Sequence, residues 1–281
     1  MSSILTNNGA IVALQTLKNV NSSLNKAQSE ISTGKSINSA KDNAAVWAIS
    51  KVMETDQSAF KAIQSNLNVA DAVVGTARAG AEQITNLLKE MKELAIGAAN
   101  DAADYGKIQT DIAAKQEQIA SIIGASQLNG INLLATDVNG SGGTSFTVLG
   151  SLDRVNGTAV TTAGNIVVAG VDFEVDIEGA TITTISDRAT AQTAIGEIEA
   201  LIDVAVQGAA DLGSSGKRIA DQANFVGKLA DSLKVGIGSL VDADMEEASA
   251  RLQALQTQQQ LGIQALSIAN QSPSAILSLF R

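Results

Sequence analysis

The side chains in this sequence that could carry chemistry are almost all carboxylates. The densest group is Asp242, Asp244, Glu246 and Glu247, whose oxygens are the kind that bind a hard cation. The group lacks the glycine and the 12-residue loop of an EF-hand, and helix capping with a solvated face explains it better. The chain has no His and no Cys, so the usual general bases and nucleophiles are absent. We therefore predict no enzyme activity, no metal site and no other cofactor.

Composition and charge exclude further classes of protein. The net charge of −10 argues against nucleic acid and anionic membrane partners. No run of about 18 apolar residues occurs, so we expect no membrane-spanning helix. The opening residues MSSILTNNGA lack a basic stretch followed by an apolar one, so we expect no cleavable signal peptide. Only 2% of residues are aromatic, and a core of Ala, Leu, Ile and Val suits helices packed closely along their length.

Heptad repeats dominate the chain. Apolar residues recur at alternating spacings of three and four in four long series, which predicts helices that wind around partners. The series are Ala10, Ala13, Leu17, Val20, Leu24, Ala27 and Ile31; then Phe60, Ile63, Leu67, Ala70, Val74, Ala77, Ala81, Ile84, Leu88, Met91, Ala95 and Ala98; then Ile195, Ile198, Ile202, Ala205, Ala209, Leu212, Gly216, Ile219, Ala223, Val226, Ala230, Leu233, Ile237 and Leu240; and finally Met245, Ala248, Leu252, Leu255, Gln259, Gly262, Leu266 and Ala269. We expect a mainly α fold, a long coiled-coil helical rod formed by the N- and C-terminal segments, with a small antiparallel β insert in the middle.

The insert is marked by a change to Gly, Thr and Val. Phe173, Val175 and Ile177 alternate with acidic residues, which predicts a half-buried strand. Asn139-Gly140 and Asn156-Gly157 are turn signals between strands. An insert of this size is too small to bury much core of its own.

Two short joints interrupt the heptads. Gly34 follows the last seam residue of the first series, where a helix commonly ends in a left-handed residue. Ser39 and Asp42 fit a capping box that starts the next helix. Asp244 and Glu247 fit the same role near the other end. We expect the two joints to lie side by side.

Trp47 follows the first joint closely. We interpret it as a packing anchor at this hinge, with a specific partner contact as the alternative.

The terminal helices have weak seams. The first series is rich in Ala and the last contains Gln259 and Gly262, so each helix buries little apolar area alone and becomes adequately stabilised only when many copies pack together. We predict that the polymerisation contacts are made by the apolar seam residues Leu17, Val20, Leu24, Ile31, Leu252, Leu255, Leu266, Ile276 and Leu279. The expected domains are an N-terminal polymerisation helix (1–40), two halves of the helical rod (41–136 and 190–243), a small β-rich insert (137–189) and a C-terminal polymerisation helix (244–281).

Four segments of the sequence resemble bacterial flagellin. They are SINSAKDNAA at the first joint, MKELAIGAAND, SQLNGINLL and ANQSPSAILSLFR, and the likeness extends over residues 1–135 and 190–281. The resemblance implies a subunit of the flagellar filament, whose terminal helices line a central channel and whose variable part faces solvent. It implies export in the unfolded state, folding at the filament tip and a secreted, extracellular location. The implied partners are further copies of the chain, hook-junction and cap proteins, the flagellar export apparatus and a secretion chaperone.

The resemblance also carries over one recognition site. A vertebrate innate receptor binds many flagellins at an Arg, a Leu and a Gln, and the matching positions here are Glu90, Leu94 and Gly97. Only Leu94 agrees, so we expect weak or no binding by that receptor. Two other functions stay open at this point: a hook–filament junction protein with the same terminal helices, and a soluble coiled-coil adaptor.

Overall fold

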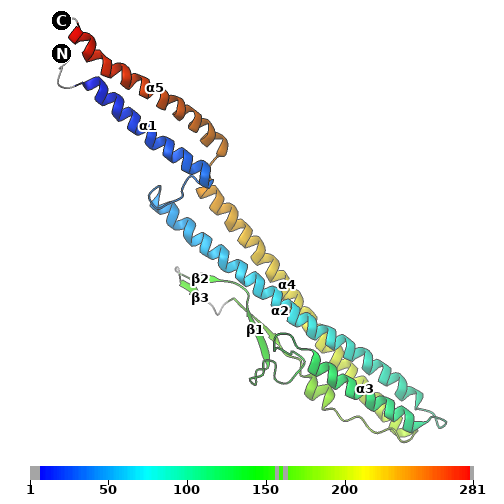
Figure 1. Ribbon diagram of the computed structural model, residues 1–281. Coiled ribbons are helices and arrows are strands. Elements are labelled where there is room, and N and C mark those ends of the chain that lie inside the picture. Colours follow the sequence, from blue (N-terminus) through cyan, green and yellow to red (C-terminus); the bar gives the residue numbers. More distant parts are fainter. Residues whose placement is uncertain (1–6, 156–157, 161–163, 279–281) are drawn as a thin grey trace. The chain divides into compact units, whose positions relative to one another are not determined.

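The structure, a computed structural model, describes residues 7–155, 158–160 and 164–278 (Figure 1). Five α-helices, four strands and one π-helical turn occur in this part of the chain. In chain order they are α1 (Asn8–Thr33), α2 (Ala44–Gly97), α3 (Tyr105–Ala125), β1 (Ser145–Leu149), β2 (Asp153–Val155), β3 (Thr158–Val160), β4 (Asn165–Ala169), η1 (Glu174–Glu178), α4 (Arg188–Val241) and α5 (Met245–Ser278). The prediction of a mainly α fold with a small antiparallel β unit is confirmed.

The chain divides into two compact units, residues 58–231 and residues 1–57 with 232–281. In the first of these units the heptad seam of α2 forms the core. Every seam residue from Phe60 to Ala98 has at most 8% of its surface exposed, because the alternating spacing keeps these side chains on one face of the helix. The core is completed by α3 and α4, through the buried residues Ile112, Ile119, Ile123, Ile198, Leu212, Ile219 and Val226.

The β unit is held against α4. Strands β1 and β4 pair antiparallel, with Ser145 opposite Ala169, and β2 pairs antiparallel with β3. Arg218 donates to the carbonyl of Val167 at 2.7 Å, and Gln222 donates to that of Gly150 at 2.8 Å. These two side chains lie four residues apart on α4, so one face of that helix anchors the insert. The turn predicted at Asn156-Gly157 lies outside the described residues.

The strand predicted at residues 173–177 is wrong. Most of this segment belongs to the π-helical turn η1, in which Ile177 is buried and Val175 is exposed, and Phe173, the residue before η1, is buried too. A spacing of four places Phe173 and Ile177 on one face of a helical turn, and the carboxylate of Asp172 accepts the N–H of Val175 at 3.1 Å to start it. The buried ring of Phe173 lies so close to Gly208 of α4 that a Cβ there would stand 2.7 Å from it.

Candidate functional site

The terminal helices α1 and α5 pack side by side in opposite directions (Figure 1). Asn7 caps α1 by accepting the N–H of Ala10 at 3.1 Å, and its side-chain amide donates to the carbonyl of Ala269 on α5 at 2.6 Å. Further along, Gln259 donates to the side chain of Asn21 at 2.6 Å. The two helices therefore share a seam that contains a polar pair as well as apolar residues.

The predicted polymerisation residues mostly line this seam within one chain. Leu24 is buried, while six others are half-buried: Leu17, Val20, Ile31, Leu252, Leu255 and Leu266. The side chain of Ile276 and all of Leu279 lie outside what the structure describes. The residues at the joint end of the pair are the most enclosed, with Ala27 at 1% and Ala248 at 4% exposure. These seam residues thus hold α1 to α5, and a direct contact between subunits stays a prediction for them.

A second set of apolar residues points away from the seam. It lies at the end of the pair that is distant from the joint, with exposures between 44% and 71%: Ile11, Val12, Leu14, Leu261, Ile263 and Ile268. We call these six residues the distal patch. They stand on more than one side of the pair, because residues two positions apart, such as Leu261 and Ile263, lie about 200° apart around a helix. Exposed apolar residues gathered at one end of a helix pair are candidates for contact with another protein.

The sequence contains a signal for the distal patch that heptad spacing alone does not give, namely apolar residues outside the seam. All six residues stand at positions outside the seam, where a solvated helix face would carry polar side chains. The half of α1 near the joint follows that rule, since its exposed residues are polar, with Lys18, Ser22, Asn25 and Ser29 among them. The two halves of this one helix therefore differ in the polarity of their exposed residues, and the half distant from the joint is the candidate for contact with another subunit.

The two joints lie side by side and are hydrogen-bonded. Gly34 ends α1 with φ of 68°, and its N–H donates to the carbonyl of Glu30 at 2.8 Å. Ser36 donates its N–H to the carbonyl of Val241 at 2.8 Å, and Ala243 donates its N–H to that of Gly34 at 2.9 Å. We call this arrangement the clasp. It ties the last turn of α1 to the segment between α4 and α5.

The capping box predicted at Ser39 is corrected by the structure. Asn43 is the N-cap of α2 and accepts the N–H groups of Ala45 and Val46, each at 3.2 Å. The carboxylate of Asp42 instead closes a turn before the helix, accepting the N–H of Ser39 at 2.9 Å and its hydroxyl at 3.0 Å. The backbone N–H of Ser39 is the main cause of a lowered pKa at Asp42.

The second joint has the predicted cap. Asp244 accepts the N–H groups of Glu246 at 2.9 Å and Glu247 at 3.2 Å, which starts α5. Glu247 pairs with Arg251 at 2.6 Å, one turn further along, and does not reach back to the cap. Trp47 lies half-buried in the first turn of α2, and its anchoring role stays a prediction.

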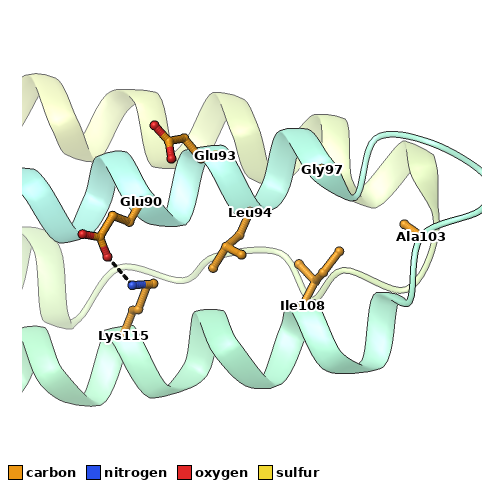
Figure 2. Close-up of a pocket in the computed structure, with 7 residues that line it drawn as sticks. All are labelled: Glu90, Glu93, Leu94, Gly97, Ala103, Ile108 and Lys115. Atoms are coloured by element: carbon orange, nitrogen blue, oxygen red, sulfur yellow. Dashed lines mark hydrogen bonds and ion pairs between the residues drawn. The ribbon is translucent and has the colours of Figure 1, made fainter.

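The positions equivalent to the receptor site gather around one groove in the other unit. Glu90, Leu94 and Gly97 of α2 line it together with Ile108 and Lys115 of α3 (Figure 2). The groove has a volume of about 450 Å³. Lys115 forms an ion pair with Glu90, so the carboxylate at this position is partly neutralised from α3. A Cβ at Gly97 would meet no atom within 4 Å, which leaves room for a larger side chain.

The described residues contain neither a cluster of metal-ligating side chains nor a membrane-spanning helix. Across residues 7–155, 158–160 and 164–278, no three acidic side chains converge as metal ligands would. Over the same ranges, no helix carries an apolar stretch long enough to cross a bilayer. The carboxylates at the second joint act as helix caps and ion-pair partners.

Comparison with known proteins assigns both ends of the chain to one family. The family model for the bacterial flagellin N-terminal helical region matches residues 4–138. The model for the bacterial flagellin C-terminal helical region matches residues 195–280. The segment between the two matches contains all four strands and η1.

Curated relatives match over the full length. The chain is 39% identical over 285 residues to flagellin FljO of Caulobacter vibrioides, covering 100% of this chain and 99% of that protein. It is 40% identical over 291 residues to a flagellin of Brucella melitensis, covering both chains fully at 100%. A solved structure described as a flagellar hook-associated protein from Vibrio parahaemolyticus shares the fold, with a TM-score of 0.55 and 13% identity over 72% of this chain and 100% of that one.

Proposed function

Since this chain belongs to the bacterial flagellin family and is a structural subunit of the flagellar filament, we propose that its distal patch makes the contacts between neighbouring subunits. The observation that carries this proposal is the exposure of Ile11, Val12 and Leu14 on α1 opposite Leu261, Ile263 and Ile268 on α5. Because the protein is structural, it has no catalytic site to explain. The relatives named above are flagellins over their whole length, which favours the filament over a junction protein or an adaptor.

The exposed area of the distal patch gives the free energy that its burial between subunits would contribute. Burying an Ile, Leu or Val side chain contributes about 1.5–3 kcal/mol, so the exposed fractions of the six residues correspond to about 5–10 kcal/mol per subunit. The loss of translational and rotational freedom on association costs about 4–15 kcal/mol. A single contact between two subunits is therefore marginal. In a lattice each subunit loses its translational and rotational freedom once but contacts several neighbours. The buried area per subunit is then larger for the same entropic cost, which favours a polymer over a dimer.

We further propose that the terminal segments fold when the subunit assembles. The seam of α1 and α5 contains Gln259, Asn21 and Gly262, and only its joint end is well buried. Ordering the backbone costs about 1–2 kcal/mol per residue, which this seam does not offset alone. Neighbouring subunits supply the missing burial. Segments that stay unfolded in the monomer also suit export of an unfolded chain, and the absence of Cys leaves no disulfide to form on the way.

The location and the remaining partners follow from the same role. We propose a secreted, extracellular subunit that meets hook-junction and cap proteins at the ends of the filament, and the export apparatus with a secretion chaperone before assembly. The two segments that match the family models would supply these contacts, because they form the part of the chain shared with other flagellins. The variable insert would face solvent, and Trp47 would anchor the hinge.

The groove of Figure 2 supports weak engagement of the innate flagellin receptor. An Arg at position 90 would offer a cation there, whereas this chain places Glu90 against Lys115. Gly97 leaves open space where a Gln would offer a donor and an acceptor. We propose that this pair of differences, with Leu94 unchanged, lowers the affinity of the receptor for this chain.

Assembly of the purified chain tests the main proposal. The protein is depolymerised, clarified and seeded with short filaments, and growth is followed by sedimentation and negative-stain imaging. We expect long filaments from the full chain and none from a fragment of residues 41–244, which lacks both terminal segments. Filaments grown from that fragment at the same rate would contradict an assembly role for α1 and α5.

A further inference from the structure

Four Asn-Gly dipeptides occur in the chain, at residues 8–9, 129–130, 139–140 and 156–157. Asn-Gly is the dipeptide most prone to lose its side-chain amide, because glycine leaves the next backbone nitrogen open to approach the asparagine Cγ. The first three lie among the described residues, in three different backbone conformations. The three dipeptides therefore allow the effect of backbone conformation on loss of the side-chain amide to be compared within one protein.

Two of the three are held in conformations that oppose the reaction. Asn8 and Gly9 lie in the first turn of α1, where the helical backbone fixes the direction of each N–H. Asn129 has φ of 55° in a tight turn, and Leu128 and Ile131 exchange backbone hydrogen bonds of 3.0 and 3.1 Å across it. Ring closure requires the backbone after the asparagine to rotate, and these contacts resist that rotation.

The third dipeptide lies in an exposed loop formed by residues 137–143. The side-chain carbonyl oxygen of Asn139 accepts two backbone N–H groups, from Ser141 at 3.0 Å and from Gly143 at 3.2 Å. Two donors aimed at one carbonyl oxygen are the arrangement that stabilises an oxyanion when a nucleophile attacks the carbon. Gly140, which supplies the attacking nitrogen, has φ of 71°, and Asn139 is open to water.

A neighbouring carboxylate holds the same loop. Asp137 accepts the N–H groups of Asn139 at 3.3 Å and Ser141 at 3.1 Å, so the single N–H of Ser141 is shared between Asp137 and Asn139. Hydrogen bonds from backbone N–H groups, that of Gly142 first, lower the pKa of Asp137, so the carboxylate is anionic over the neutral range. It holds the loop folded through its own backbone bonds, which keeps the two donors of Asn139 in place.

We propose that the folded loop makes Asn139 a site of spontaneous deamidation, and that the N–H groups of Ser141 and Gly143 accelerate the reaction. The backbone nitrogen of Gly140 loses its proton to solvent base and forms a bond to Cγ of Asn139. The negative charge on Oδ1 is held by the two N–H groups. The bond from Cγ to the side-chain nitrogen then breaks, and that nitrogen takes a proton from water and leaves as ammonia. Water opens the resulting succinimide at either carbonyl and yields aspartate or isoaspartate.

The product changes the surface of the insert without altering the helices. Each reacted subunit gains one negative charge at residue 139, two residues from the carboxylate of Asp137. An aspartate in this position would accept the same two N–H groups more strongly than the amide does, because the acceptor is then charged. Residue 139 lies just outside the segment 4–138 that matches the family model, so assembly should not depend on the reaction.

The test is a time course on the purified full chain at mildly alkaline pH. Peptide mass spectrometry in ¹⁸O-labelled water measures incorporation at each Asn-Gly, and an isoaspartyl methyltransferase confirms the isomer. We expect Asn139 to react at least about fivefold faster than Asn129 in the native protein, and the difference to disappear in denaturant. Ser141→Pro removes the N–H that Asn139 and Asp137 share and should slow Asn139 about fivefold, whereas Ser141→Ala keeps that N–H and should change little.

The opposite results would overturn the proposal. A native rate at Asn139 no higher than at Asn129 would mean that the loop protects the amide. A faster reaction in Ser141→Pro, with the circular dichroism unchanged, would mean that the two N–H groups restrain the side chain and do not assist its attack. Filament assembly is scored separately, so a negative result here leaves the proposal for the distal patch untouched.

Discussion

Replacing Ile11 and Ile268 together by serine should raise the concentration at which filaments form, while leaving the folded part of the monomer unchanged. The two residues are 56% and 71% exposed on α1 and α5, so the monomer gains little from them. If neighbouring subunits bury both side chains, the loss on substitution is about 2–4 kcal/mol per subunit. Since each 1.4 kcal/mol is a factor of ten, the critical concentration should rise roughly 30- to 700-fold.

Sedimentation of seeded reactions over a range of protein concentrations measures this quantity. The matched control is Val175→Ser, because Val175 is exposed to a similar extent, at 57%, but lies in η1 between the two segments that match the family models. The control should assemble at the concentration of the unmodified protein. Thermal unfolding followed by circular dichroism should give the same transition for all three proteins.

An unchanged critical concentration for the double variant would refute the reasoning. It would mean that the distal patch faces solvent or a channel in the filament. The contacts between subunits would then have to come from the half-buried seam residues that the heptads predict. Substitution of Leu24, which is 8% exposed and holds α1 to α5, would be the variant to examine next.

Four further outcomes are expected. Limited proteolysis should trim the two terminal segments rapidly from the soluble monomer, whereas filaments resist; equal resistance in both states would contradict folding on assembly. Replacing the variable insert by a short Gly/Ser linker should preserve filaments on cells, because the insert adds little to the shared helical core, and their loss despite normal secretion would show otherwise. Exchanging the ion pair in Glu90→Arg with Lys115→Glu, together with Gly97→Gln, should raise signalling through the innate receptor in a reporter assay; an unchanged response would place the control of recognition elsewhere. Asp42 has a lowered pKa in the folded chain, so its contribution to the first joint is present above the unfolded value and is lost as the pH falls through the folded one; an acid titration of Asp42→Asn should lack that loss, measured against the unmodified protein.

The heptads predicted the core of the fold because burial in a long helix depends almost entirely on spacing. The seam from Phe60 to Ala98 is buried along its whole length, as the pattern requires. The pattern failed at Phe173 and Ile177, where a spacing of four fits both a strand and a helical turn, and where the N–H of Val175 donates to the side chain of Asp172 in the helical turn that forms. The conformation of such short segments depends on hydrogen bonds that the hydrophobic periodicity of the sequence does not predict.

The candidate site was predicted less completely, for a related reason. The sequence placed the joints correctly at Gly34 and Asp244, since a left-handed glycine and an acidic cap leave clear signals. It assigned the start of α2 to Ser39, although Asn43, which has the same capping chemistry, lies four residues later and makes the bonds. A cap is chosen by where the preceding turn ends, and here the carboxylate of Asp42 fixes that turn. The contacts between subunits depend on how the subunits are arranged in the assembly. The sequence pattern of one chain therefore does not identify the seam residues that make them.

The clasp also sets the order in which the chain can fold. Ser36 and Val241 meet across 205 residues of sequence, and bringing such distant points together in an unfolded chain costs about 5 kcal/mol of loop-closure entropy. A few backbone hydrogen bonds, each worth about 1 kcal/mol net, do not offset that cost by themselves. We therefore expect the clasp to close after residues 58–231 have folded and shortened the effective loop. On this expectation the contact between α1 and α5 forms late in folding, after residues 58–231 have reached their folded structure.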